Sequence, residues 1–327
     1  MSPFSKYATR NKVIILGNGF DVDLGMRSRY SDFAKSKIWA DNIENNFSHL
    51  MHEGLLKALK DAKIRYNWFD IEQTMMDFIR RMQSVKQRGQ IVIDEEEDRA
   101  EYQLVCKCLK DYLREESKSF RINQQSTAYS AYKALIDKGG FNKVYTFNYT
   151  DINDIADRIG ITNKPEITHV HGSLLPNDDI ILGVEGGDII PEEYKFMYKT
   201  SSKFYHSNNL YQDLMQAGEV VFFGHSINGM DFEYFRSFFQ IQSDDSLEGY
   251  KRKYIRIFTY DNESATDIKY NLQCNGIDLI ALYNLNDLDF FRTKGIESGE
   301  DYDSSLFSQF IKDITEMKGP KVQFKKL

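Results

Sequence analysis

Polar residues and glycines gather in four short segments that each follow an apolar run. The first is Gly17-Asn18-Gly19-Phe20-Asp21, which follows Lys12–Leu16. Glycines at positions 17 and 19 allow a tight turn and let backbone N–H groups approach a phosphate. The third glycine of the dinucleotide-binding pattern is absent, because position 22 is Val. The segment therefore fits either a phosphate-binding turn or an ordinary strand-to-helix turn. Asp21 would cap a helix there or direct its carboxylate at a ribose or nicotinamide group.

The second segment carries an amide side chain. Asn148 stands in the sequence TFNYTD at residues 146–151, where Thr146 ends an apolar run. An Asn side chain offers one acceptor and two donors, which suits a ligand at the carboxyl end of a strand. The competing interpretation is that Asn148 or Thr150 caps a helix over residues 151–159.

The third segment contains two histidines, His169 and His171, followed by Gly172. Strand alternation places both imidazoles on one side of a strand, and a reference pKa near neutrality suits proton transfer. Two histidines at this spacing also suit zinc, but His206 and His225 are distant in sequence and no third ligand stands nearby. We therefore expect no metal.

The fourth segment is Gly224-His225-Ser226, with Asp231 downstream. Ser226 and the neighbouring N–H groups suit phosphate or ribose oxygens. A nucleophilic serine elbow would need Gly at position 228, which is Asn, so a hydrolase triad is not favoured.

Short buried strands must position these segments. Apolar runs typical of such strands occupy residues 12–16, 144–147, 167–170, 180–182, 220–223, 254–260 and 277–282. Runs of this kind separated by helical stretches predict an α/β fold with a mainly parallel, Rossmann-like sheet. The four polar segments then share the carboxyl edge of the sheet, where nucleotides bind.

More than a hundred residues separate the first two predicted strands, and they have helical periodicity. Tyr102, Val105, Leu109 and Leu113 follow the spacing of a one-sided helix, and residues 75–82 repeat it. The acidic run 94–98 indicates a solvated loop or the start of a helix. We therefore predict one domain over residues 1–327, with a helical insertion over about 30–140.

Composition excludes several classes. The chain has 327 residues and a net charge of −7, so we do not expect nucleic acid as a partner. Its apolar runs are too short to span a bilayer, and residues 1–6 contain no apolar core of a signal peptide, which predicts a cytoplasmic protein without membrane contact. Three Cys provide neither a disulfide framework nor a four-thiolate zinc site.

The four segments, in this order, resemble the AbiH family of bacterial proteins, named for abortive infection as a defence against bacteriophage. Two further stretches add to this resemblance, Arg29-Tyr30-Ser31-Asp32-Phe33 and Trp68-Phe69-Asp70-Ile71-Glu72.

The same segments resemble, more remotely, the sirtuin-like NAD-binding fold. That resemblance implies that Gly17, Asn18, Gly19 and Phe20 meet the NAD phosphates. It places Thr146, Asn148 and His171 at the nicotinamide ribose, and Gly224, His225, Ser226 and Asp231 along the rest of the dinucleotide. The chain lacks the four-Cys zinc module of sirtuin deacetylases, so protein deacylation is not expected. Sirtuin-like domains without that module are typically NAD-consuming hydrolases in phage defence.

The resulting hypothesis is an NADase that cleaves the nicotinamide–ribose bond, with His171, Asn148 and Asp21 as catalytic residues and Glu72 as a lining residue. The transition state of this reaction resembles an oxocarbenium ion. The alternative is a non-catalytic sensor of NAD or an ADP-ribose derivative. A further alternative is an interaction module, in which the helical insertion binds a second copy or a partner from a defence system.

Overall fold

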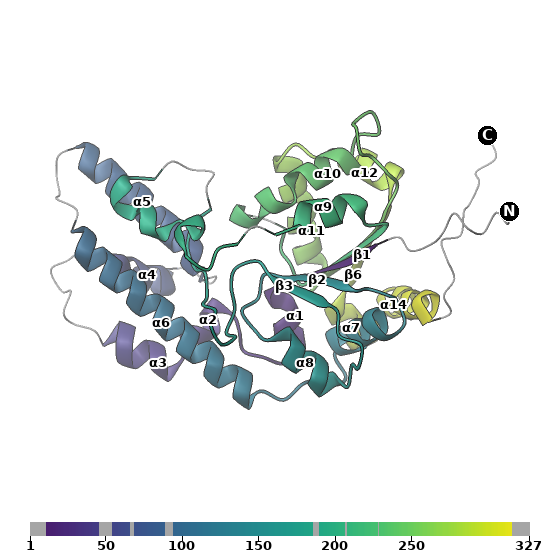
Figure 1. The fold of residues 1–327 in the computed structure, drawn as a ribbon, viewed down its shortest axis with the longest axis horizontal. Coiled ribbons are helices and arrows are strands. Elements are labelled where there is room, and N and C mark those ends of the chain that lie inside the picture. The colour runs from purple at the N-terminus through teal and green to yellow at the C-terminus, as the bar shows by residue number, and fades with distance from the viewer. Residues whose placement is uncertain are drawn as a thin grey trace.

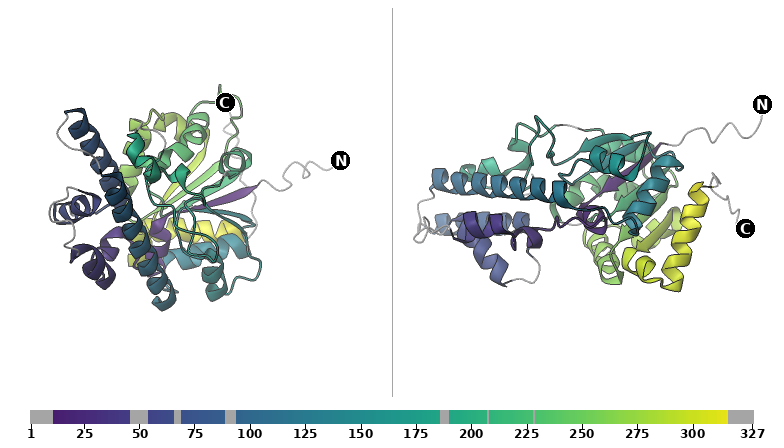
Figure 2. Two further views of the ribbon diagram at one scale, coloured as in Figure 1. Left: turned by 60° about the vertical axis from the view of Figure 1, so that its left-hand side comes forward. Right: turned by 90° about the horizontal axis from the view of Figure 1, so that it is seen from below.

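The computed structural model describes residues 11–45, 54–65, 69–88, 94–185, 190–206, 208–227 and 229–315. The N-terminal residues 1–10 and Trp68 lie outside these ranges. An α/β core with a central sheet forms one side of the molecule, and a group of helices that includes the long α6 extends from it (Figures 1 and 2). Within the described residues, no helix combines the length and apolar character needed to span a bilayer.

Six parallel strands form the sheet, in the order β3-β2-β1-β4-β5-β6. The strands are β1 (Lys12–Leu16), β2 (Lys143–Thr146), β3 (Glu166–His169), β4 (Glu219–Phe223), β5 (Tyr254–Thr259) and β6 (Asp287–Arg292). This is the Rossmann strand order, in which the direction of winding reverses between β1 and β4. The prediction of a Rossmann-like parallel sheet is confirmed.

Helices cover both faces of the sheet, which explains why its central strands consist almost entirely of apolar residues. Val13 and Ile15 of β1 face a cluster that includes α9 (Leu210–Gln216), α10 (Arg236–Gln242) and α11 (Asn262–Cys274). Ile14 and Leu16 face the opposite cluster. That cluster contains residues of α1 (Asn18–Asp23), α7 (Thr127–Asp137), α8 (Ile152–Ile159) and α14 (Asp301–Thr315), and α13 (Thr293–Ser298) packs at its side.

Two predicted strands are wrong. Residues 180–182 form no strand, because Ile180 makes only an isolated antiparallel bridge to Gly172. The run 277–282 leads into helix α12 (Leu279–Leu285), whose first turn is capped by the Asp278 side chain. The true edge strand β6 was missed, since its sequence DLDFFR mixes acidic and apolar residues. Periodicity alone does not separate a short buried helix from a strand.

A set of helices between β1 and β2 has a hydrophobic core of its own. We call α2 (Tyr30–Phe33), α3 (Lys37–Trp39), the π-helix η2 (Ala40–Glu44), α4 (Leu55–Arg65), α5 (Ile71–Gln87) and α6 (Glu95–Ser119) the helical lobe. Trp39, Met75 and Tyr112 lie in its core, and Tyr194 and Met197 enter that core from a 3-10 helix after β3, η3 (Glu192–Met197). Helix α7, by contrast, packs on the sheet. The insertion over 30–140 stays a prediction.

The N-termini of the long lobe helices are capped by Asp side chains. Asp70 accepts a hydrogen bond from the Gln73 N–H, and Asp94 accepts one from the Glu97 N–H. The acidic run 94–98 is therefore the start of α6, where negative charge complements the helix dipole. Glu72 occupies the first turn of α5, and this places a carboxylate of the lobe beside the carboxyl edge of the sheet.

Candidate functional site

The turns after β1 and β4 are in direct backbone contact at the carboxyl edge of the sheet. The Gly17 N–H donates to the Phe223 carbonyl at 3.0 Å, and the Gly19 N–H donates to the Gly224 carbonyl at 2.9 Å. A Cβ on Gly17 would lie 2.6 Å from the His225 Cα, so a larger residue does not fit there. Both glycines are therefore needed because two chain segments approach each other closely. A glycine pattern in the sequence does not distinguish this requirement from phosphate binding.

Three of the four amides that the sequence assigned to phosphate donate hydrogen bonds within the protein. Besides Gly17 and Gly19, the Phe20 N–H donates within its own turn, to the Gly17 carbonyl. The exposed Asn18 side chain accepts a hydrogen bond from the Ser28 hydroxyl at 2.5 Å. The phosphate role of this turn stays a prediction, and it would require the turn to give up hydrogen bonds that it makes within the protein.

Asp21 and Asn148 connect the turns after β1 and β2. Asp21 is 2% exposed; its Oδ2 accepts from the Thr150 hydroxyl at 2.8 Å, and its Oδ1 has no partner among the described residues. Asn148 donates through Nδ2 to the Gly17 carbonyl at 3.0 Å. Burial raises the pKa of Asp21 to about 7, against the opposing hydrogen bonds from Thr150 and Asn148. Asp21 is therefore a buried acid that exchanges its proton near neutral pH.

His171 lies at the centre of a buried charged cluster. Its Nε2 is 3.3 Å from Asp231 Oδ1 and 3.5 Å from Glu185 Oε1. The Lys199 ammonium lies 3.3 Å from the same ring nitrogen and 3.2 Å from Glu72 Oε1. It also lies 3.4 Å from Asp231 Oδ1 and 3.5 Å from Glu185 Oε1. We call His171, Lys199, Glu72, Glu185 and Asp231 the His171 cluster.

The charges of the cluster depend on one another. Burial alone would raise the pKa of Asp231, but Lys199 and His171 lower it to about 2. Burial would likewise raise the pKa of Glu185, but the hydrogen bond from His171 and the charges of Lys199 and His171 together lower it. Burial would lower the pKa of Lys199, yet the three carboxylates raise it. Among the three carboxyl groups, only Glu72 has a raised pKa, because burial prevails over the charge of Lys199 there. At neutral pH the Lys199 ammonium thus lies beside the ionised carboxylates of Asp231 and Glu185.

Aromatic rings separate His171 from the second buried imidazole. Phe147 lies edge-on to both rings, with centroids 5.1 Å from His171 and 4.5 Å from His225. His225 Nδ1 accepts the Ile227 N–H at 3.0 Å, and burial lowers the pKa of His225 to about 4. His225 is therefore neutral, with its Nε2 side 3.8 Å from Asp231. Ser226 is exposed on the same turn.

The two histidines near the end of β3 have different partners. The strand ends at His169, so strand alternation does not extend to His171. His169 is partly buried and lies 3.2 Å from the Asn148 carbonyl, whereas His171 lies in the charged cluster. Thr146 ends β2, is fully buried, and accepts the Asn148 N–H through its hydroxyl. Of the predicted residues, His171 and Asp231 thus meet directly.

Sequence reasoning missed Lys199 and Glu185 and named Glu72 only as a lining residue. Glu185 and Lys199 belong to the long connection from β3 to β4, where Val184 and Lys199 are joined by a backbone hydrogen bond of 3.0 Å. No motif marks this pairing. The sequence does not distinguish Lys199 from Lys195 and Lys203, which lie in the same stretch and are exposed.

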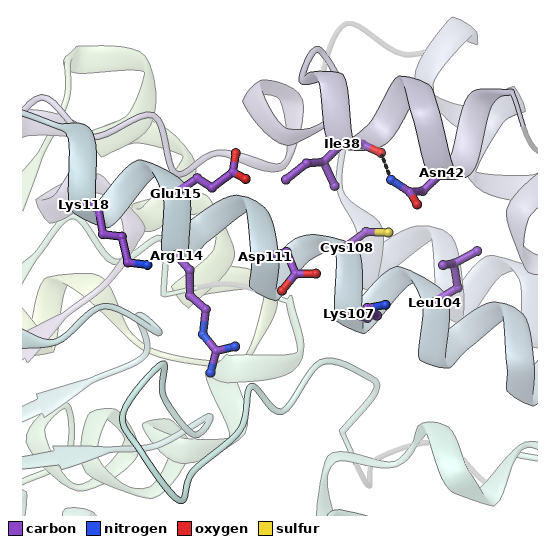
Figure 3. Close-up of a pocket in the computed structure, with 9 residues that line it drawn as sticks. All are labelled: Ile38, Asn42, Leu104, Lys107, Cys108, Asp111, Arg114, Glu115 and Lys118. Atoms are coloured by element: carbon purple, nitrogen blue, oxygen red, sulfur yellow. Dashed lines mark hydrogen bonds between the residues drawn. The ribbon is translucent and has the colours of Figure 1, made fainter.

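Two surface hollows lie away from the cluster. The first, of about 380 Å³, runs along α6 and faces α3 and η2 (Figure 3). It is lined by Ile38, Asn42, Leu104, Lys107, Cys108, Asp111, Arg114, Glu115 and Lys118. The second, of about 590 Å³, lies between the end of α6 and α8. Neither is lined by a residue of the His171 cluster.

The strand order and the buried polar cluster at the carboxyl edge define a Rossmann-like α/β protein with a candidate small-molecule site. The chain belongs to the AbiH family: the family model described as "Bacteriophage abortive infection AbiH" matches residues 13–248. This range contains β1 except Lys12, all of β2 to β4, the helical lobe and the whole His171 cluster. No curated protein matches the chain. Membership of this family implies a role in abortive infection, a defence against bacteriophage.

Proposed function

We propose that the protein acts in this defence by binding NAD at the carboxyl edge of the sheet and hydrolysing its nicotinamide–ribose bond. The observation that carries the proposal is the His171 cluster, a buried imidazole in contact with two ionised carboxylates at the ends of parallel strands. Ligands of open α/β sheets bind at this edge, near the reversal of strand order.

The reaction breaks the bond from the ribose C1′ to the nicotinamide nitrogen, and the bonding electron pair leaves with nicotinamide. Positive charge then develops on the ribose, as in other glycosyl transfers. Asp231 is the most accessible member of the cluster, with 25% of its side chain exposed. Its ionised carboxylate stabilises that positive charge, and water adds to C1′.

His171 accepts the proton that the attacking water loses. Its Nε2 faces the carboxylates of Asp231 and Glu185, which orient the ring and stabilise the imidazolium that forms. Asn148 and Asp21 lie outside the His171 cluster, where their hydrogen bonds hold the turns after β1 and β2 together. We therefore give these two residues positioning roles, which refines the catalytic roles expected from the sequence.

The alternative function is a sensor that binds NAD or an ADP-ribose derivative without turnover. One observation favours it: Lys199 is fully buried and His171 is 5% exposed, so the cluster is almost closed to solvent. A cluster that is almost closed to solvent leaves little access for the attacking water, which favours binding without turnover.

Nicotinamide release separates the two functions. Purified full-length protein is incubated with NAD⁺, and nicotinamide is followed by chromatography, alone and with phage lysate. We expect release that is lost in Asp231→Asn and retained in the matched control Asp313→Asn, an exposed Asp on α14. Calorimetric binding of NAD⁺ without nicotinamide release would support the sensor. The absence of both binding and release would refute both functions.

A further inference from the structure

We propose that Lys199 is a positioning residue whose ammonium supplies, beside His171, Glu185 and Asp231, the positive charge that a divalent cation would otherwise supply. The inference goes beyond the proposed function, because it concerns how the site is assembled and holds whether or not the site turns over NAD.

The three side chains around Lys199 have the spacing of a metal site. One ligand atom from each of His171, Glu185 and Asp231 lies within 4.8 Å of the others. An imidazole with two carboxylates is a common donor set for divalent transition metals. The Lys199 ammonium lies 3.3 to 3.5 Å from all three groups. These are contact distances for an ammonium group, so the donor set already has a cation beside it.

The backbone delivers Lys199 to this position. The Val184 N–H donates to the Met197 carbonyl at 2.8 Å, and the Lys199 N–H donates to the Val184 carbonyl at 3.0 Å. These bonds pair the two ends of the segment that carries Glu185. Gly183 reinforces the pairing, because a Cβ there would lie 2.2 Å from the Met197 carbonyl oxygen. Lys199 is thus fixed beside Glu185 by the main chain, and its side chain has no exposed surface.

The ammonium does not form a directed hydrogen bond with the imidazole. It lies 3.4 Å from His171 Nδ1 and 3.3 Å from Nε2, and two nearly equal distances exclude alignment with the lone pair of either nitrogen. Lys199 therefore acts on His171 through charge and through the carboxylates that both groups share. It draws Glu185 and Asp231 to Nε2 and, through Glu72, adds a carboxylate from the helical lobe.

Removal of the ammonium leaves carboxylates around His171 without a cation. The Lys199→Met variant keeps most of the side-chain volume and vacates the charged position. We therefore expect this variant to bind a divalent cation that the wild-type protein does not bind. A side chain with a merely structural role would not produce this gain of binding.

The test is a calorimetric titration of EDTA-treated full-length protein with Mn²⁺ and, separately, Zn²⁺. We expect Lys199→Met to bind one Mn²⁺ per chain, and the wild type to show no binding at about ten times the variant's half-saturating concentration, since a divalent ion replaces a buried monovalent one. Adding Asp231→Asn to Lys199→Met should abolish that binding. The control Lys203→Met, at an exposed lysine nearby in sequence, should behave as the wild type.

Two results would overturn the proposal. One is a folded Lys199→Met variant that binds neither ion. The other is wild-type protein that binds Mn²⁺ or Zn²⁺ and loses that binding in Asp231→Asn, because the ion would then displace the lysine. The second result needs no Lys199 variant, so the proposal remains testable if Lys199→Met does not fold. Neither titration requires NAD, so failure here is distinct from failure of the proposed function.

Discussion

Lys199 Nζ lies 3.2 Å from Glu72 Oε1, so a buried ion pair joins the helical lobe to the carboxyl edge of the sheet. Glu72 Oε1 also accepts the Gly183 N–H at 3.2 Å, which ties the same carboxylate to the connection after β3. The geometry of the His171 cluster therefore depends on where the lobe lies.

Glu72→Gln should weaken this link without emptying the space. Glutamine still accepts the Gly183 N–H, whereas the charge that faces Lys199 is lost. We expect a loss of about 0.5–1.5 kcal/mol in the free energy of unfolding, the net value of one hydrogen bond, because the burial that raises the pKa of Glu72 offsets its attraction to Lys199. Urea unfolding measures it. Asp77→Asn, at an exposed position of the same helix, should change stability by less than about 0.5 kcal/mol. Equal effects from the two substitutions would contradict the link.

Asp21 should make the protein less stable as pH rises. Its pKa is about 7 in the folded protein against an ordinary value of 3.8, so the folded state retains a proton that the unfolded chain releases. Stability from this group is complete below about pH 4, falls as pH rises towards 7, and is then constant. The loss amounts to at most about 4 kcal/mol at 1.36 kcal/mol per pKa unit.

The Asp21→Asn variant isolates this contribution. Asn does not titrate, so denaturant unfolding at pH 5 and at pH 8 should differ less in the variant than in the wild type. Asp23 retains its own raised pKa, to which burial contributes most, so part of the dependence will remain. An unchanged pH profile in Asp21→Asn would show that Asp21 is ionised throughout this range.

His171→Ala should reduce NAD hydrolysis by about 100-fold or more, the usual contribution of a positioned general base. The rate of nicotinamide release measures it, with circular dichroism to verify folding. His206→Ala removes an exposed imidazole and should leave the rate unchanged. Full activity in a folded His171→Ala protein would place the site elsewhere.

Val221→Asp should prevent folding. Val221 is completely buried in β4, between β1 and β5, and a carboxylate there has no partner. Burying an unpaired polar group costs several kcal/mol, which is a large part of the stability of a domain. Soluble yield and circular dichroism test this. A soluble, cooperatively unfolding variant would contradict the central position of β4.

The sheet could be predicted because its central strands carry their signal locally. Val13, Ile14, Val220 and Val221 lie in apolar runs that only a strand covered on both faces requires. Parallel strands end at one edge, so the polar turns after β1, β2 and β4 had to meet there. The edge strand β6 escaped this reasoning because charged residues alternate with apolar ones in it.

The charged centre of the site could not be predicted in the same way. Lys199 and Glu185 meet through the path of the connection between β3 and β4, and Glu72 reaches them from the lobe. These contacts depend on tertiary packing and leave no periodicity in the sequence. Gly17 and Gly19 illustrate a second limit of sequence reasoning: a pattern can be present for another reason. The glycines expected to bind phosphate make a backbone contact with the end of β4 and Gly224.

The entry of Tyr194 and Met197 into the core of the helical lobe limits how such proteins can be recombined. The core of the lobe is not formed by the segment between β1 and β2 alone, because a second segment, after β3, contributes residues to it. A chimera that receives only the first stretch from a relative would place a foreign surface against the Tyr194 ring, which donates a hydrogen bond to Asp98 of α6. Exchange of the lobe between relatives therefore requires two grafts at once, and the second graft carries Lys199 with it.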